Sequence, residues 1–186
     1  TLDVWDAKLA STGEAVARAR AELVATLEPE VVKAYDQVAH TAAEVALAYH
    51  RSWEGPLAAA VAASRADDLR RGVTLVGPHR DELALTVGGL PGRTHASPGE
   101  QRSLALALRL GAHRAVGHQV GEFPVLLLDD VFSELDRDRA EALLDHLPPG
   151  QALLSTTGPL PPAARPRHPI RLAAAQLQPA PPEPAP

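Results

Sequence analysis

Two adjacent carboxylates, Asp129 and Asp130, directly follow a short apolar run. That run, Val125–Leu128, is typical of a strand buried on both faces in a sheet covered by helices. Ligands of open α/β sheets bind beyond the carboxyl ends of strands, and Mg²⁺ on nucleotide phosphates takes a few hard oxygen ligands and keeps several waters. The pair therefore suits phosphate chemistry, although a turn that caps the next helix explains it as well.

A second candidate site begins at Ser97, ahead of the apolar run Ser103–Leu110. Serine is a good N-cap, and Pro98 fits the first helical position, where a missing N–H has no cost. A helix that starts at Ser97 presents free backbone N–H groups and its positive dipole end beside a hydroxyl. We expect an anion site here, and an ordinary capped helix is the simpler alternative.

The order of these segments resembles the ATPase head of the ABC-type chromosome-maintenance proteins, most closely the RecF family. The matching motifs are the ABC signature loop (Ser97–Arg102), a Walker B strand that ends at Asp129, and a D-loop (Ser133–Asp136). Gly77–Asp81 and Leu2–Asp6 also look like RecF strings. The resemblance extends to about Leu172 and leaves out only the proline-rich tail.

The resemblance implies a role for each residue at the acidic pair. Asp129 would hold Mg²⁺, directly or through water, and Asp130 would polarise the water that attacks ATP. Many ABC enzymes have glutamate at the second position, so aspartate predicts slower hydrolysis. Thr156 or Thr157, where transporters place a histidine, would orient the γ-phosphate or the water; a simple strand-end turn fits them equally well.

The resemblance also implies a homodimer in which ATP is sandwiched between two heads. Ser97 and Gly99 would bind the γ-phosphate of ATP held by the second subunit, and the D-loop residues Ser133 and Asp136 would contact the partner nearby. The full set of signature residues expected at the cofactor is Ser97, Gly99, Glu100, Gln101 and Arg102.

The sequence contains no Gly-x-x-x-x-Gly-Lys-Ser/Thr phosphate loop, because Lys8 and Lys33 are its only lysines and neither follows a glycine. We therefore expect the C-terminal portion of a longer protein, inactive alone. The resemblance implies that the parent is a slow ATPase that binds single-stranded and gapped or duplex DNA. It would help to load recombinase at gaps together with recombination mediator proteins.

Three alternatives stay open at this point. A transporter head should show a Leu-Ser-Gly-Gly-Gln signature and a switch histidine, and this sequence has neither. A chromosome-condensing protein should carry very long heptad arms, whereas the arm here is short. The third alternative is a scaffold fragment with no ATP binding of its own.

Composition sets further bounds. The sequence is 45% apolar and 22% charged, which is typical of a globular protein, and it has no cysteine, which excludes disulfides and zinc–thiolate sites. No apolar run is long enough to cross a bilayer. We expect no membrane partner and a cytoplasmic, nucleoid-associated location. The net charge of −5 does not itself indicate DNA binding, so any DNA contact needs a local face.

The elements that position these residues divide the chain into an inserted helical arm (1–71), the C-terminal part of an ABC-type head (72–173) and a disordered Pro/Ala-rich tail (174–186). The heptad Leu2, Leu9, Val16 and Leu23, with Trp5, predicts a helix along a partner helix, broken at Glu28–Glu30. A second helical pattern, a strand from Val45 to Arg51 and an alanine-rich helix to Arg70 follow.

In the head, the patterns predict an α/β fold with mostly parallel strands. The expected strands are 73–76, 83–87, 125–128, 151–155 and an edge strand at 170–172; the expected helices run from Ser97 to about Val116 and from Arg137 to Leu147. Arg80 and Asp81 should pin arm to head. An open sheet edge and an exposed apolar face predict poor solubility.

Overall fold

The computed structural model describes residues 2–39, 41–173 and 176–178. The helices are α1 (Leu2–Val38), α2 (Leu57–Arg71), α3 (Gly92–His95), α4 (Pro98–Val120) and α5 (Arg137–Asp145), with short 3-10 turns η1 (Pro78–Arg80) and η2 (Val131–Ser133). The strands are β1 (Val45–His50), β2 (Glu82–Val87), β3 (Leu90–Pro91), β4 (Leu126–Asp129), β5 (Ala152–Ser155), β6 (Arg171–Ala173) and β7 (Gln176–Gln178). None of the helices described is both long and apolar enough to cross a membrane.

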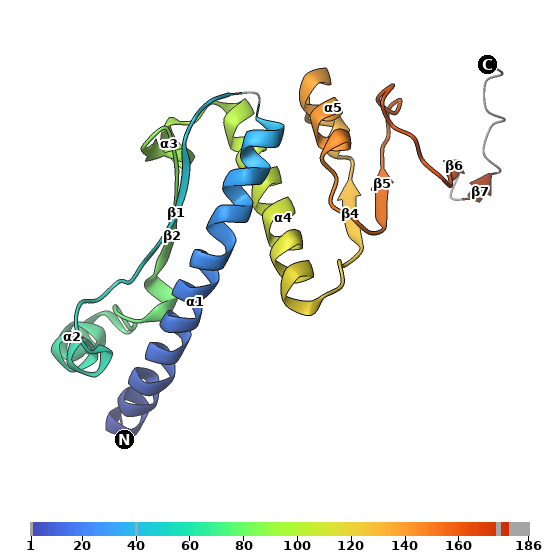
Figure 1. The fold of residues 1–186 in the computed structure, drawn as a ribbon. Helices are drawn as coiled ribbons and strands as arrows, with labels where there is room; N and C mark the ends of the chain where they lie inside the picture. Colours follow the sequence, from blue (N-terminus) through green and yellow to red (C-terminus); the bar gives the residue numbers. More distant parts are fainter. Residues whose placement is uncertain (1, 40, 174–175, 179–186) are drawn as a thin grey trace, which may run out of the picture.

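Helices α1 and α4 lie antiparallel, side by side, and form the centre of the molecule (Figure 1). Their main contact joins the second half of α1 to α4 in one core cluster that includes Val31, Tyr35 and Leu110. The two backbones come very close. A Cβ added at Gly111 would lie only 2.7 Å from Val31 Cγ2 and 2.9 Å from the Val31 backbone nitrogen. Glycine at 111 therefore sets the spacing of this pair.

Three antiparallel strands, in the order β1–β2–β3, lie beside α1 (Figure 1). The register runs from Val45 opposite Val87 to His50 opposite Glu82. The predicted strands at 45–51 and 83–87 are thus confirmed. Gly88 and Gly89, with φ of 59° and 76°, make the tight turn into β3, which suits residues without a Cβ. Strand β1 from the expected arm pairs with β2 from the expected head, so the division near residue 71 stays a proposal.

Strands β4 and β5 pair in parallel, from Leu126 opposite Ala152 to Asp129 opposite Ser155. Leu126 and Leu128 enter the main core, whereas Leu127 and Leu153 are 69% and 54% exposed. The prediction of a strand buried on both faces is therefore wrong for β4: one face packs on the helices and the other is open. The exposed apolar face that we expected is confirmed.

The α/β class is confirmed, and the parallel sheet is the β4–β5 pair. The strands described are otherwise antiparallel, in β1–β2–β3 and in β6–β7. Strand β6 covers most of the expected edge strand at 170–172, but it pairs with β7 rather than with the head sheet. Part of the expected disordered tail, residues 176–178, is thus a strand; residues 174–175 and 179–186 lie outside the described residues.

The predicted break at Glu28–Glu30 is wrong, because α1 continues through Pro29. Beyond the proline, Val31, Tyr35 and Val38 are fully buried, so tertiary packing outweighs the hydrogen bond that a proline cannot make. Glu28 contributes a further contact, since its carboxylate accepts a 3.0 Å hydrogen bond from the Leu47 N–H of β1.

The heptad seam predicted in the first half of α1 is also wrong. Leu2, Trp5, Val16 and Leu23 are between 41% and 67% exposed, and of the predicted seam only Leu9 packs against the cluster at α2. The buried face instead carries small residues, Ala10, Gly13 and Ala17, and a Cβ at Gly13 would lie 2.5 Å from Leu57 Cδ2 of α2. Close packing of α2 selects this face, and size rather than apolar character decides which residues fit.

Residues 73–76 form a loop and not the predicted strand. Side chains satisfy the backbone there: Asp68 accepts a 3.1 Å bond from the Leu75 N–H, and the Thr74 carbonyl bonds His79 and Arg80. Such local side-chain bonds compete with strand pairing. The other predicted helices are confirmed, with α4 reaching Val120 and α5 ending at Asp145.

Candidate functional site

The two carboxylates lie where two parallel strands end. Asp129, the last residue of β4, accepts a short hydrogen bond from the Ser155 hydroxyl at the end of β5. The Asp130 N–H bonds the carbonyl and the hydroxyl of Ser155, at 3.1 and 3.2 Å. Thr157 donates to Asp130 Oδ1 from its N–H at 3.2 Å and from its hydroxyl at 3.3 Å. We call Asp129, Asp130, Ser155 and Thr157 the acidic edge.

The backbone at Asp130 is itself unusual. Its φ of 47° makes it the only non-glycine residue with positive φ in the described part of the chain. This left-handed conformation is uncommon, although aspartate tolerates it better than most residues. It turns the chain sharply from β4 into η2, and Asp130 stays partly buried while Asp129 is exposed.

Ser155 also belongs to this network, although its sequence context predicts only a place in a strand. Its register opposite Asp129 makes it a neighbour, a signal that only strand pairing reveals. Thr156 behaves differently from Thr157. Its hydroxyl donates to the Gly158 carbonyl at 3.3 Å and accepts from the Gly158 N–H at 3.2 Å. Thr156 thus closes a turn, while Thr157 contacts the predicted catalytic carboxylate.

The oxygen donors of the acidic edge suit an ion that keeps several waters rather than one coordinated entirely by protein side chains. Among the residues described, no group of three or more His, Cys, Asp or Glu side chains could hold a metal. Two carboxylates with hydroxyls beside them match Mg²⁺, which keeps several waters and takes further ligands from phosphates. The exposed Asp129 carboxylate is open to such an ion. The residues therefore fit Mg²⁺ with nucleotide phosphates.

The second predicted site lies at the start of α4. Ser97 is the N-cap: its hydroxyl accepts from the Glu100 N–H at 3.3 Å, and Glu100 Oε2 accepts from the Ser97 N–H at 2.8 Å. Hydrogen bonding of the Glu100 carboxylate by the Ser97 side chain, and then by the Ser97 backbone N–H, lowers the pKa of Glu100, and the positive charge of Arg139 adds to the effect. The predicted helix start is confirmed, with a reciprocal capping box.

The next two signature residues support the loop. Gln101 donates to the carbonyls of Ala96 and Arg93, at 3.0 and 3.4 Å, and so fixes the turn before the helix. Arg102 donates to the Glu134 carbonyl of the D-loop at 3.3 Å. Both side chains bond within the chain, while Ser97 is exposed and Gly99 is partly buried.

The D-loop joins the two sites. Ser133 donates to the Asp130 carbonyl at 2.8 Å, so this end belongs with the acidic edge. Asp136 is the N-cap of α5, where it accepts from the Arg139 N–H at 2.9 Å. In the described part of the chain, the hydrogen bonds of the signature segment reach the D-loop but not Asp129 or Asp130. The start of α4 and the ends of β4 and β5 nevertheless point toward the same end of the molecule (Figure 1).

Asp81 has the structural role that we predicted. It accepts from the Tyr49 hydroxyl and, at 2.9 Å, from the Ser52 N–H, and so ties the turn at η1 to the end of β1. Burial, followed by the Asp81 hydrogen bond, raises the pKa of Tyr49. Arg80 instead bonds Thr74 at 3.3 Å, close to its own turn. Arg20 makes a further tie, to the Pro78 carbonyl at 2.5 Å.

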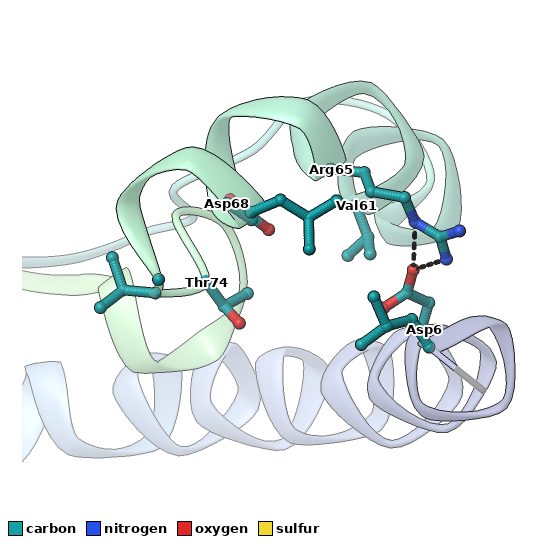
Figure 2. A pocket seen from close by; sticks show the side chains of 9 residues that line it. Asp6, Val61, Arg65, Asp68 and Thr74 are labelled. Carbon is teal, nitrogen blue, oxygen red and sulfur yellow. Dashed lines mark hydrogen bonds and ion pairs between the residues drawn. The ribbon is translucent and has the colours of Figure 1, made fainter.

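A hollow of about 250 Å³ lies between the start of α1 and the end of α2 (Figure 2). The Arg65 guanidinium closes one side of it through ion pairs to Asp3 and Asp6. These acids offset the charge of Arg65, so it does not add to a basic face. The hollow lies at the opposite end of the molecule from the start of α4 (Figure 1).

No family model matches the chain. Two curated relatives described as DNA replication and repair protein RecF, from Streptomyces avermitilis and Frankia alni, are each 46% identical over 84% of the chain. The chain spans 44% and 45% of these relatives, or slightly less than half.

Two solved structures also resemble it: the recombination mediator protein RecF with ATPrS and with ATP, in the RecFOR pathway. Their TM-scores are 0.79 and 0.81, at 26% identity over 95% of this chain and 49% of each of those chains.

Proposed function

The chain belongs with the RecF family over the segment that it shares with these relatives, and on that premise we propose that it supplies half of an ATP site. The acidic edge would serve the nucleotide of its own subunit, and the start of α4 would close on the nucleotide of a second copy. A longer protein of RecF length would provide the phosphate loop. ATP would then hold two such heads together as a dimer.

The observation that carries this proposal is the acidic edge itself. Two carboxylates at the ends of parallel strands, held by Ser155 and Thr157, form a fixed oxygen surface suited to phosphate-bound Mg²⁺. The capped start of α4 belongs to a separate contact group. Its N–H groups at Ser97, Glu100 and Gln101 are already bonded within the chain, which leaves the Gly99 N–H beside the exposed Ser97 as the backbone donor for an anion. This separation supports a site completed by two copies.

Each residue of the acidic edge then has one task. Asp129 would hold Mg²⁺, whose charge offsets that of the phosphates. Asp130 would accept a hydrogen bond from the attacking water and align it, while Thr157 fixes the orientation of the carboxylate. Since Asp130 already accepts two bonds from Thr157 and is one methylene shorter than glutamate, we expect slow hydrolysis, which suits a switch.

The wider role is a proposal of the same kind. RecF relatives named for DNA replication and repair, and solved RecF structures assigned to the RecFOR pathway, support a part in DNA repair. The partners would be single-stranded and gapped or duplex DNA and recombination mediator proteins, with recombinase loading at gaps, in the cytoplasm near the nucleoid. Because this segment has a net charge of −5, we expect the main DNA contact on a local face or elsewhere in the longer protein.

Light scattering of the RecF-length protein with and without ATP tests the dimer. We expect ATP to produce dimers and Ser97→Arg to abolish them, because a bulky cation would fill the capped helix start. Ser11→Arg, an equally drastic change on the exposed face of α1, is the matched control and should leave dimers intact. Dimers that persist in the Ser97→Arg variant would contradict the proposal.

A further inference from the structure

We propose that Arg139 is a positioning residue that fastens the signature helix α4 to the D-loop, so that both partner-facing segments move as one body. The inference rests on the proposed function and deepens it, because it names what couples the two halves of the dimer contact. Arg139 lies in α5, outside the signature, the acidic edge and the D-loop.

Arg139 contacts both segments at once. Its Nε donates to the Ser103 hydroxyl of α4 at 3.1 Å, and its Nη1 forms a short ion pair with Asp136 Oδ2 of the D-loop. The Arg139 backbone N–H also donates to Asp136 Oδ1 at 2.9 Å. Arg139 therefore bonds α4 through Nε, and it bonds the two oxygens of the D-loop carboxylate through its backbone N–H and Nη1.

The guanidinium lies directly against the signature. A Cβ added at Gly99 would lie 3.3 Å from Arg139 Nη2, tighter than ordinary van der Waals contact. Ser103 is only 1% exposed and the Arg139 side chain 22%, so the bond between them is largely shielded from solvent, whereas the Asp136 side chain is 51% exposed. Charge-assisted hydrogen bonds in such surroundings are stronger and more directional than exposed ones.

This arrangement changes the role expected of Asp136. Both of its carboxylate oxygens bond Arg139. The Arg139–Asp136 pair would therefore fix the conformation in which the D-loop contacts the partner subunit. The bond from Arg102 to the Glu134 carbonyl, at 3.3 Å, lies beside the same junction but involves one neutral acceptor. Arg139 thus combines an ion pair at the D-loop with a hydrogen bond to α4, whereas Arg102 reaches the D-loop through one carbonyl.

Arg137 provides a matched comparison within the same helix. It pairs with Glu141 four residues later, at 2.9 Å, and its side chain is 77% exposed. Removing it should affect only the surface of α5. A loss seen for Arg139 and not for Arg137 would therefore come from the junction and not from α5 as such.

The experiment compares Arg139→Ala, Arg139→Lys, Ser103→Ala, the double variant Arg139→Ala/Ser103→Ala and Arg137→Ala in the RecF-length protein. For each, the ATP-driven dimer constant, ATP binding by the dilute monomer and the thermal midpoint are measured. We expect Arg139→Ala and Ser103→Ala each to weaken the dimer by roughly tenfold, and the double variant to lose no more than Arg139→Ala alone. Lysine keeps a positive charge for Asp136 but cannot bond Ser103 and Asp136 at once as the planar guanidinium does, so Arg139→Lys should also weaken the dimer.

Monomer ATP binding should stay unchanged in all five, and Arg137→Ala should dimerise normally. Additive losses in the double variant, or normal dimers in Ser103→Ala and Arg139→Lys, would overturn the inference. If Arg139→Ala does not fold, Ser103→Ala and Arg139→Lys decide. Ser97→Arg separates the two claims: if it abolishes dimers while the Arg139 variants keep them, only the coupling role fails, and if it leaves dimers intact, both fail.

Discussion

Asp130 combines a strained backbone with a tightly held carboxylate. Its φ of 47° and its bonds to Ser155 and Thr157 aim the side chain along one direction. Unusual backbone conformations of this kind persist only where the surroundings fix them, and they gather at functional sites. The acidic edge is therefore preorganised around Asp130 rather than around Asp129.

We expect Asp130→Asn in the RecF-length protein to slow ATP hydrolysis about 10²- to 10⁴-fold, the usual contribution of a positioned acid or base. Dimer formation with ATP should survive, because the signature contacts remain. Single-turnover hydrolysis measures the rate, and Asp145→Asn, exposed at the end of α5, is the control. Hydrolysis at the parental rate would remove Asp130 from the catalytic role.

The capping box predicts a pH-dependent contribution to stability. The pKa of Glu100 is lowered from its ordinary value of 4.5, so its bond to Ser97 stabilises the fold above that pH and is lost as pH falls through the lowered value. Glu100→Ala should therefore lower the free energy of unfolding at neutral pH but have little effect at an acid pH below the lowered pKa.

Urea unfolding of the two proteins across this range measures the difference, with the exposed Glu122→Ala as control. A cost for Glu100→Ala that is the same at both pH values would mean that the carboxylate charge is not involved.

Among the helices and strands, the start of α4 was predicted correctly from the sequence, whereas the packing around the motifs was predicted less well. Ser97, Pro98 and Glu100 fix the start of α4 through local bonds, and local rules predict local bonds. Ser155 was missed because its place beside Asp129 depends on the β4–β5 register. The predicted helix break at Pro29 and the predicted heptad seam were wrong for the same reason: packing by distant elements decides where α1 continues and which face of it is buried.

The α1–α4 contact yields a prediction of its own. Gly111→Ala should destabilise the fold by about 1–3 kcal/mol, because the new methyl group has no room against the backbone of Val31. Helix propensity alone would favour alanine by ~1 kcal/mol, so the sign of the change tests the close packing.

Urea unfolding gives the value, and Ala105→Gly on the exposed side of α4 measures the propensity effect alone. A stabilised Gly111→Ala variant would show that the two helices are further apart than the structure has them.

For the whole molecule, the open face of the β4–β5 sheet matters most. Leu127 and Leu153 are exposed side by side on paired strands, together with Val125. Contiguous exposed apolar surface of this kind promotes association. The same two strands end at the acidic edge, so the open face and the site belong to one sheet.

We expect the 186-residue chain to aggregate, and Leu127→Lys with Leu153→Lys to raise its soluble fraction severalfold. Centrifugation followed by light scattering measures the effect. Leu2→Lys with Leu23→Lys, on the exposed stripe of α1, serves as a comparison of equal charge. Equal gains from both pairs would trace the effect to exposed leucines in general and not to the sheet face.

Above all, we propose that this segment completes an ATP site in another copy. Mixing two RecF-length variants tests it directly: one carries Ser97→Arg, and the other keeps Ser97 but has a disabled phosphate loop. Each alone should stay monomeric with ATP, whereas the mixture should give an ATP-dependent heterodimer by cross-linking, because one intact sandwich remains. A mixture that stays monomeric, with both proteins folded, would contradict a site shared between two subunits.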